Sequence, residues 1–176
     1  AVGDWSGYVP VRPLGGGKLD EKIVNRWLKK VFECPADKIM HNAQYDLGWI
    51  KQMGFQVNGK IIDTMLVASL LDENRFSYSL NALAYDVLNK TKSEKQLVEA
   101  AREFGVDPKA EMWKMPAAFV GPYAEVDAEL TLELWNVFSV QLAKEDLSTI
   151  AELELKLLPC LVEMTARGVR IDQERV

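Results

Sequence analysis

The sequence of 176 residues has only two cysteines and one histidine, and no long uninterrupted apolar run. Two cysteines are too few for a disulfide framework, so we expect a protein of a reducing compartment. The single histidine leaves a Ser-His-Asp or Cys-His relay with one possible base and no evident nucleophile, and the sequence has no paired-cysteine zinc spacing. Because no stretch of about 18 consecutive apolar residues occurs, the sequence predicts no insertion into a membrane.

Positive charge is also scarce, since 21 lysines and arginines face 26 aspartates and glutamates, for a net charge of −5. A protein with this balance does not coat nucleic acid by bulk charge. It can still be a nucleic-acid enzyme, because carboxylates that hold divalent cations reverse the local field. The hydrophobic share of 48% and the chain length fit one globular domain.

Short β-prone segments alternate with longer segments of helical apolar spacing, which predicts an α/β domain. We expect strands at 8–11, 38–40 and 61–62, and helices at 19–32, 63–71, 79–88, 94–104, 121–142 and 147–165. A further helix follows the strand at 38–40 at once, and its apolar positions lie within 47–53. Pro122 suits a first helical position, so we expect the longest helix to begin at Gly121-Pro122. Pro159 predicts a kink or break near Leu158.

The first group of chemically useful residues follows the strand expected at 38–40. Asn42 and Asp46 are four residues apart and share a face of the helix that follows. Asp46 continues into the apolar positions Trp49, Ile50 and Met53, so its carboxylate is expected to point inward. An inward acid needs a partner, although the start of a helix by itself favours an acid by about 0.3 to 1 kcal/mol.

The second group has the same spacing near the start of the longest helix. Tyr123 and Asp127 are four residues apart, and Leu130, Leu134 and Phe138 continue the face of Asp127. An ionised carboxylate in such an apolar stripe costs several kcal/mol unless it is paired or bound to a metal. Neither spacing is specific alone, but two inward acids near helix starts are less easily explained by chance than one.

Phosphodiester hydrolysis explains such a pair of acids. Two divalent cations about 4 Å apart can clamp the attacking and leaving oxygens, and hard cations such as Mg²⁺ or Mn²⁺ prefer carboxylate ligands. We therefore expect Asp46 and Asp127 to be catalytic residues that bind metal. Tyr123 is expected to orient the attacking water, and Asn42 to bind a substrate oxygen.

These motifs resemble those of the 3′-5′ proofreading exonuclease domain of family A DNA polymerases, in the DEDDy group of the ribonuclease H-like superfamily. Asn42-Ala43-Gln44-Tyr45-Asp46 matches the second exonuclease motif of that family, Asn-x-x-(Tyr/Phe)-Asp. Tyr123 to Asp127 matches the third motif, Tyr-x-x-x-Asp. The segments 62–65 and 79–84 are similar to the Asp-Thr-Met and Ser-Leu segments that lie between the two motifs.

The resemblance implies a ribonuclease H-like exonuclease fold, with a mixed sheet flanked by helices. It also implies a 3′-5′ exonuclease that acts on single-stranded or frayed 3′ ends of DNA. Residues 157–164 and 168–172 are similar to the segment that enters the polymerase domain. We therefore expect residues 1–146 to be the exonuclease domain and 147–176 to begin the polymerase domain of the same full-length chain.

One part of the family pattern is absent. The first motif, Asp-x-Glu on the first strand, has no counterpart with that context here. We expect the first strand and its two acids to lie upstream of Ala1, which makes the chain an N-terminally truncated domain of impaired activity. The resemblance places the protein in the cytoplasm of a bacterium or of a phage-infected cell.

Two other functions remain open on the sequence. The domain could be a non-catalytic scaffold of a polymerase, although it retains Asp46 and Asp127. It could also be an RNase D-like 3′-5′ exoribonuclease, which the polymerase-like segment at the C-terminal end disfavours.

Lys92, like Lys90 and Lys95, is expected in a solvated loop. Helical spacing favours core positions for the tryptophans Trp27, Trp49 and Trp135.

Overall fold

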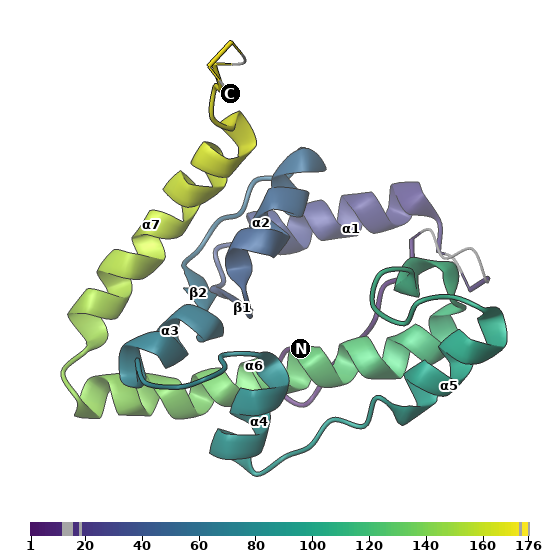
Figure 1. Ribbon diagram of the computed structural model, residues 1–176, viewed down its shortest axis with the longest axis horizontal. Coiled ribbons are helices and arrows are strands. Elements are labelled where there is room, and N and C mark those ends of the chain that lie inside the picture. Colours follow the sequence, from purple (N-terminus) through teal and green to yellow (C-terminus); the bar gives the residue numbers. More distant parts are fainter. Residues whose placement is uncertain (12–15, 18, 173, 176) are drawn as a thin grey trace.

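The computed structural model describes residues 1–11, 16–17, 19–172 and 174–175. Helices dominate these ranges, and Figure 1 shows them around one short pair of strands. The strands are β1 (Lys38–Met40) and β2 (Ile61–Asp63). The helices are α1 (Glu21–Glu33), α2 (Ala43–Gln52), α3 (Thr64–Leu71), α4 (Leu80–Leu88), α5 (Lys95–Phe104), the 3-10 helix η1 (Met112–Lys114), α6 (Ala117–Lys144) and α7 (Ser148–Arg167).

The two strands run parallel and are joined by a crossover that contains α2. Lys38 pairs with Ile61, and Met40 pairs with Asp63, so both strands end at the same edge of the sheet. This confirms the strands predicted at 38–40 and 61–62 and the α/β character of the domain. Within the described ranges the sheet consists of this parallel pair, so the antiparallel part of the predicted mixed sheet is not found there.

Local sequence signals explain where several helices begin or end. The Asp20 carboxylate accepts hydrogen bonds from the backbone N–H groups of Lys22 and Ile23 and so caps α1. The Ser79 hydroxyl caps α4 through the N–H of Ala82. Gly105 ends α5 in a left-handed conformation with φ 63°. These helices agree with the predicted ones to within two residues at each end.

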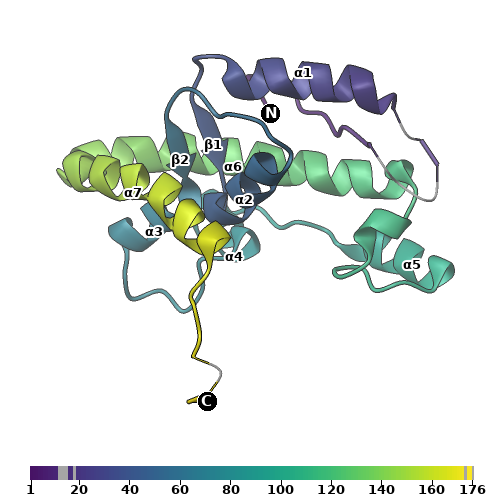
Figure 2. The ribbon, with the colours of Figure 1, turned by 90° about the horizontal axis from the view of Figure 1, so that it is seen from above.

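Helix α6 is the longest helix and runs the length of the molecule in Figures 1 and 2. It begins at Ala117, after Pro116 in an extended conformation, so the predicted start at Gly121-Pro122 is wrong. Pro122 lies inside the helix, where its ring nitrogen cannot donate to the carbonyl of Ala118. The earlier start adds a turn of helix before Tyr123.

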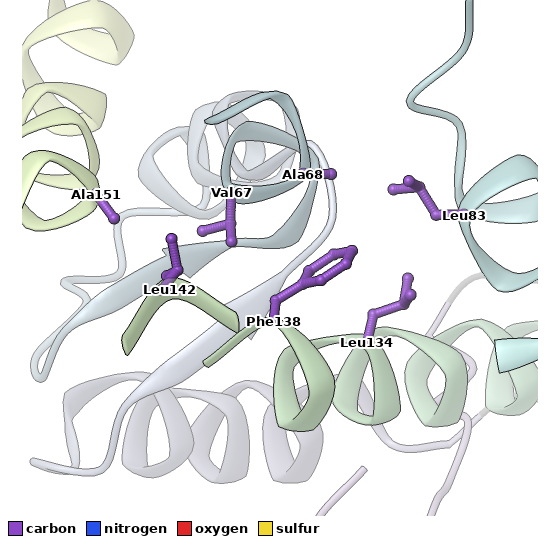
Figure 3. Packing of buried hydrophobic residues seen from close by; sticks show 7 residues of the cluster. All are labelled: Val67, Ala68, Leu83, Leu134, Phe138, Leu142 and Ala151. Atoms are coloured by element: carbon purple, nitrogen blue, oxygen red, sulfur yellow. The ribbon is translucent and has the colours of Figure 1, made fainter. Parts of the chain in front are cut away.

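The main hydrophobic core holds α6 in place. Figure 3 shows side chains from α3, α4, α6 and α7 meeting there: Val67, Ala68, Leu83, Leu134, Phe138, Leu142 and Ala151. Full burial of a leucine or phenylalanine side chain contributes about 1.5 to 3 kcal/mol. Leu130, Leu134 and Phe138 are all buried, as the sequence predicts. Their burial fixes the rotation of α6 and thereby the direction of the side chains on its first half.

The N-terminal segment does not form the strand predicted at 8–11. The backbone N–H of Tyr8 donates a hydrogen bond to the Glu125 carboxylate on α6, at 3.1 Å. The Tyr8 side chain packs on a second hydrophobic cluster that joins α5 to α6. This segment is therefore bound to a helix through a side chain, an arrangement that β-propensity does not reveal.

Two further expectations differ from the structure. A kink or a break is expected near Leu158, and the break does not occur, because helix α7 continues across Pro159. Trp27 and Trp49 are 43% and 54% exposed, whereas Trp135 packs against the main core as predicted. No helix in the described ranges combines the length and the apolar character needed to cross a bilayer.

Candidate active site

The site begins at the shared edge where β1 and β2 end. His41 and Asn42 follow β1, and Asp63 is the last residue of β2. The carboxyl ends of parallel strands are the usual place for ligands in open α/β sheets. Side chains from two separate stretches of the sequence therefore meet at this edge.

Asp63 organises the turn between β1 and α2. Its carboxylate accepts hydrogen bonds from the backbone N–H groups of Asn42 at 3.0 Å and Ala43 at 2.9 Å, and it also caps α3 through Met65 N–H at 2.9 Å. Asp63 is 3% exposed. The short motifs in the sequence do not assign Asp63 a role, although its position at the end of a strand, directly before a helix, is the signal that could identify it.

Asn42 adopts the left-handed conformation, with φ 63° and ψ 53°. Asparagine tolerates this conformation better than most residues other than glycine. Its side chain is exposed and makes no capping hydrogen bond to α2. The structure therefore gives Asn42 a backbone role that the sequence did not predict.

Asp46 lies in the first turn of α2 and is half-buried. Burial, and after it the negative charge of Asp63, together raise the pKa of its carboxyl group from 3.8 to about 6. The ionised form of Asp46 therefore lacks enough positive charge around it. A cation at this position would provide that charge and favour the ionised form.

His41 lies between β1 and α2 and interacts with residues from other parts of the chain. Its Nδ1 atom is hydrogen-bonded to Thr64 Oγ1 at 2.9 Å. Burial lowers the pKa of the imidazole, while the charges of Asp63 and Asp127 and the backbone carbonyl of Tyr78 oppose that shift. His41 is therefore neutral at pH 7 and lies within electrostatic range of both carboxylates.

Tyr123 and Asp127 lie one turn apart on α6, and both are half-buried. Lys92, from the segment between α4 and α5, forms an ion pair with Asp127 Oδ1. Its ammonium nitrogen also lies 3.0 Å from the centroid of the Tyr123 ring. Lys92 is not in a solvated loop as predicted, because its side chain is only 3% exposed.

The four predicted site residues therefore come from two elements. Asn42 precedes α2 and Asp46 lies in its first turn, both close to Asp63. Tyr123 and Asp127 lie on α6, and the charge of Asp127 reaches His41. Among the described residues no group of three or more Asp, Glu, His or Cys side chains is arranged to hold a metal ion. The donors that are present, hard carboxylate oxygens, suit Mg²⁺ or Mn²⁺.

Comparison with known proteins shows the family. A family profile described as 3′-5′ exonuclease, of the DNA polymerase A type, matches residues 17–143. This chain belongs to the 3′-5′ exonuclease domain family of family A DNA polymerases. The resemblance based on the Asn42 to Asp46 and Tyr123 to Asp127 motifs is thereby confirmed.

Curated relatives of this exonuclease domain are DNA polymerases of phages and bacteria. The DNA-directed DNA polymerase of Pseudomonas phage M6 is 38% identical over 97% of this chain and 26% of its own length. DNA polymerase DpoZ of Salmonella phage PMBT28 is 31% identical over 85% of the chain and 25% of its own length. DNA polymerase I of Rhizobium leguminosarum is 31% identical over 92% of this chain and 16% of its own length. The chain thus spans about a quarter of the phage polymerases.

Two solved structures share the fold of this chain. Brucella melitensis NrnC with bound Mg²⁺ superposes with a TM-score of 0.61 at 21% identity, over 80% of this chain and 64% of that chain. A structure described as the apo form of the nuclease gives 0.64 at 18% identity, with the same coverage. At such identities the likeness establishes the fold alone.

Proposed function

We propose that this exonuclease domain hydrolyses the 3′-terminal phosphodiester of DNA and so removes mispaired nucleotides for a polymerase domain in the same full-length chain. The observation that carries the proposal is the position of the two inward acids. The charge of Asp63 raises the pKa of Asp46 on α2. The charges of Asp63 and of Asp127 on α6 both act to raise the pKa of His41. Two acids far apart in the sequence are therefore linked, through Asp63 and His41, near the carboxyl ends of the strands.

Asp46 and Asp127 are the residues that we assign to two divalent cations, Mg²⁺ or Mn²⁺. The uncompensated charge of Asp46 supports this assignment, and the related fold of NrnC has been solved with Mg²⁺. Two bound cations stabilise the negative charge that develops on the attacking and leaving oxygens. Two carboxylates balance only half of the +4 charge of two ions, so further acids, such as an Asp-x-Glu motif, are needed for full activity.

The other two residues act on the water and the substrate. The Tyr123 hydroxyl, one turn from Asp127, accepts or donates a hydrogen bond that orients the attacking water. The exposed Asn42 amide, held in place by its left-handed backbone, contacts a substrate oxygen without adding charge. His41 stays neutral beside them, so it does not repel a cation.

Digestion of a 5′-labelled, single-stranded DNA by the full-length protein tests the proposal. With Mg²⁺ present, Asp127→Ala and Asp46→Ala should lower the rate by about 10³-fold or more, as expected when a principal charge-stabilising group is lost. Glu133→Ala is the matched control, because Glu133 is an exposed acid further along α6 that pairs with Lys90. Unchanged digestion by the Asp127 variant would remove the assignment.

A non-catalytic scaffold is the second candidate, and one observation favours it: Lys92 already neutralises Asp127. A scaffold would show no digestion by the wild-type protein with Mg²⁺ or Mn²⁺, while polymerase activity persists. An RNase D-like exoribonuclease would prefer an RNA oligonucleotide of the same sequence. The named relatives are DNA polymerases, so we infer DNA as the substrate and the cytoplasm of a bacterium or a phage-infected cell as the place of action.

A further inference from the structure

Lys92 occupies an unusual position for a lysine. Its side chain is 3% exposed, although it comes from the connection between α4 and α5. Lys90, two residues earlier, reaches the same helix α6 but pairs with Glu133 at the surface, where the two side chains are 51% and 40% exposed. Both lysines thus form ion pairs with acids of α6, but the Lys90 pair is exposed to water and the Lys92 ammonium is buried in the candidate active site.

The surroundings of the Lys92 ammonium explain why it can be buried. A buried ammonium needs an opposite charge and further electrostatic partners to replace its hydration. The Asp127 carboxylate provides the charge, and the face of the Tyr123 ring provides a cation–π contact at 3.0 Å. Lys92 therefore bridges the two residues of the third exonuclease motif with a single positive charge.

We propose that Lys92 is a positioning residue that stands in for a divalent cation at Asp127. It holds the Asp127 carboxylate and the Tyr123 ring together before a cation binds, and it withdraws from the carboxylate when one arrives. This inference rests on the proposed function, since it assumes that Asp127 ligates a metal. It adds that the cation must compete with a charge supplied by the protein itself.

The competition follows from charge and geometry. A divalent cation on the same carboxylate would lie close to the ammonium, and like charges in a partly buried site repel strongly because little water screens them. A divalent cation that binds Asp127 must therefore either displace the Lys92 ammonium or bind next to it. Displacement and repulsion both weaken the affinity for the cation. Removing the charge of Lys92 should tighten metal binding.

The test measures Mn²⁺ binding to the full-length protein by isothermal titration calorimetry. We expect Lys92→Met to lower the Kd for Mn²⁺ at this site by about tenfold, equivalent to the loss of one charge contact in a partly buried site. Lys90→Met is the matched control and should leave the Kd unchanged. Asp127→Asn shows the binding that remains at other sites, and this background is subtracted.

Thermal unfolding without divalent cations provides a second readout. Lys92→Met leaves the Asp127 carboxylate without its partner, so the melting temperature should fall, and Mn²⁺ should restore more of it than in the wild type. If the methionine variant does not fold, Lys92→Gln decides the matter, because a neutral amide can still hydrogen-bond to Asp127. An unchanged or raised Kd in the folded variant overturns the inference.

The outcomes separate this inference from the proposed function. Wild-type protein that digests DNA, together with a Lys92 variant that binds Mn²⁺ no more tightly, overturns the inference and leaves the nuclease assignment in place. Wild-type protein that binds Mn²⁺ without digesting DNA overturns the nuclease assignment. A Lys92 variant with an unchanged Kd and a lower kcat would instead mean that the ammonium acts on the reacting atoms.

Discussion

Asp63, the last residue of β2, accepts a hydrogen bond at 3.0 Å from the backbone N–H of Asn42, which follows the last residue of β1 by two positions. The contact ties together the ends of the two parallel strands. It also fixes the left-handed turn that leads into α2 and hence the direction of Asp46. A buried carboxylate with no direct part in the proposed chemistry thus determines the shape of the site.

Asp63→Ala should destabilise the fold strongly. The change leaves three backbone N–H groups, of Asn42, Ala43 and Met65, without their acceptor. Each unsatisfied buried donor costs about 1 to 3 kcal/mol, so we expect a loss of about 3 kcal/mol or more in the free energy of unfolding. Chemical denaturation measures it. Asp37→Ala, which removes one exposed bond to the Lys60 N–H, should cost less than about 1 kcal/mol, and an equal loss in both variants would contradict this role.

Asn42→Gly separates the backbone role of Asn42 from its side-chain role. Glycine accepts φ 63° without strain, so the free energy of unfolding should change little, whereas Asn42→Ala should lose about 1 kcal/mol. The amide is absent from both variants, so both should raise the KM for single-stranded DNA. A glycine variant with wild-type KM would show that Asn42 shapes the turn and does not bind the substrate.

Asp46→Asn should stabilise the domain at alkaline pH in the absence of divalent cations. The pKa of Asp46 is raised from 3.8 to about 6 in the fold, so the folded state holds more protons than the unfolded state between these values. Stability therefore falls as the pH rises through this window, and the loss is complete above it. The melting temperature of the variant should exceed that of the wild type at about pH 8 and equal it at about pH 3.5. A lower melting temperature of the variant at alkaline pH would contradict the burial argument.

Tyr123→Phe should slow digestion without weakening the fold. Phenylalanine keeps the ring face against which the Lys92 ammonium lies, so the melting temperature should match that of the wild type. Loss of the hydroxyl should lower kcat by about 10- to 100-fold, the cost of a poorly oriented nucleophile. Single-turnover digestion with Mg²⁺ measures the change. A kcat equal to that of the wild type would leave Tyr123 with a structural role alone.

Much of the fold could be predicted because helices and buried strands have a local signature. The apolar spacing from Leu130 to Phe138 and the cap at Ser79 each depend on residues a few positions apart. The start of α6 was misjudged because proline is also tolerated inside a helix when neighbouring segments pack on it. The strand expected at 8–11 failed for a related reason, since a bond to Glu125, more than 100 residues away, determines the conformation of Tyr8.

The candidate site could be predicted in part for the same reasons. The sequence singles out Asp46 and Asp127 because an acid on an apolar stripe needs a partner, and because the motifs around them resemble a family. Lys92 was missed because a lysine in a polar connection is usually solvated, and nothing local indicates that its ammonium reaches Asp127. The division at residue 146 and the Asp-x-Glu motif upstream of Ala1 stay predictions, as do the roles of the site residues.

The most direct test of the central claim is the anomalous scattering of Mn²⁺ in crystals of the full-length protein. We expect one peak in contact with the carboxylate oxygens of Asp127 and a second near Asp46, bound directly or through water. We also expect the Lys92 ammonium to have moved away from Asp127 in the same crystals. Bound Mn²⁺ that is found only at other sites, with Asp46 and Asp127 contacting no ion, would contradict it.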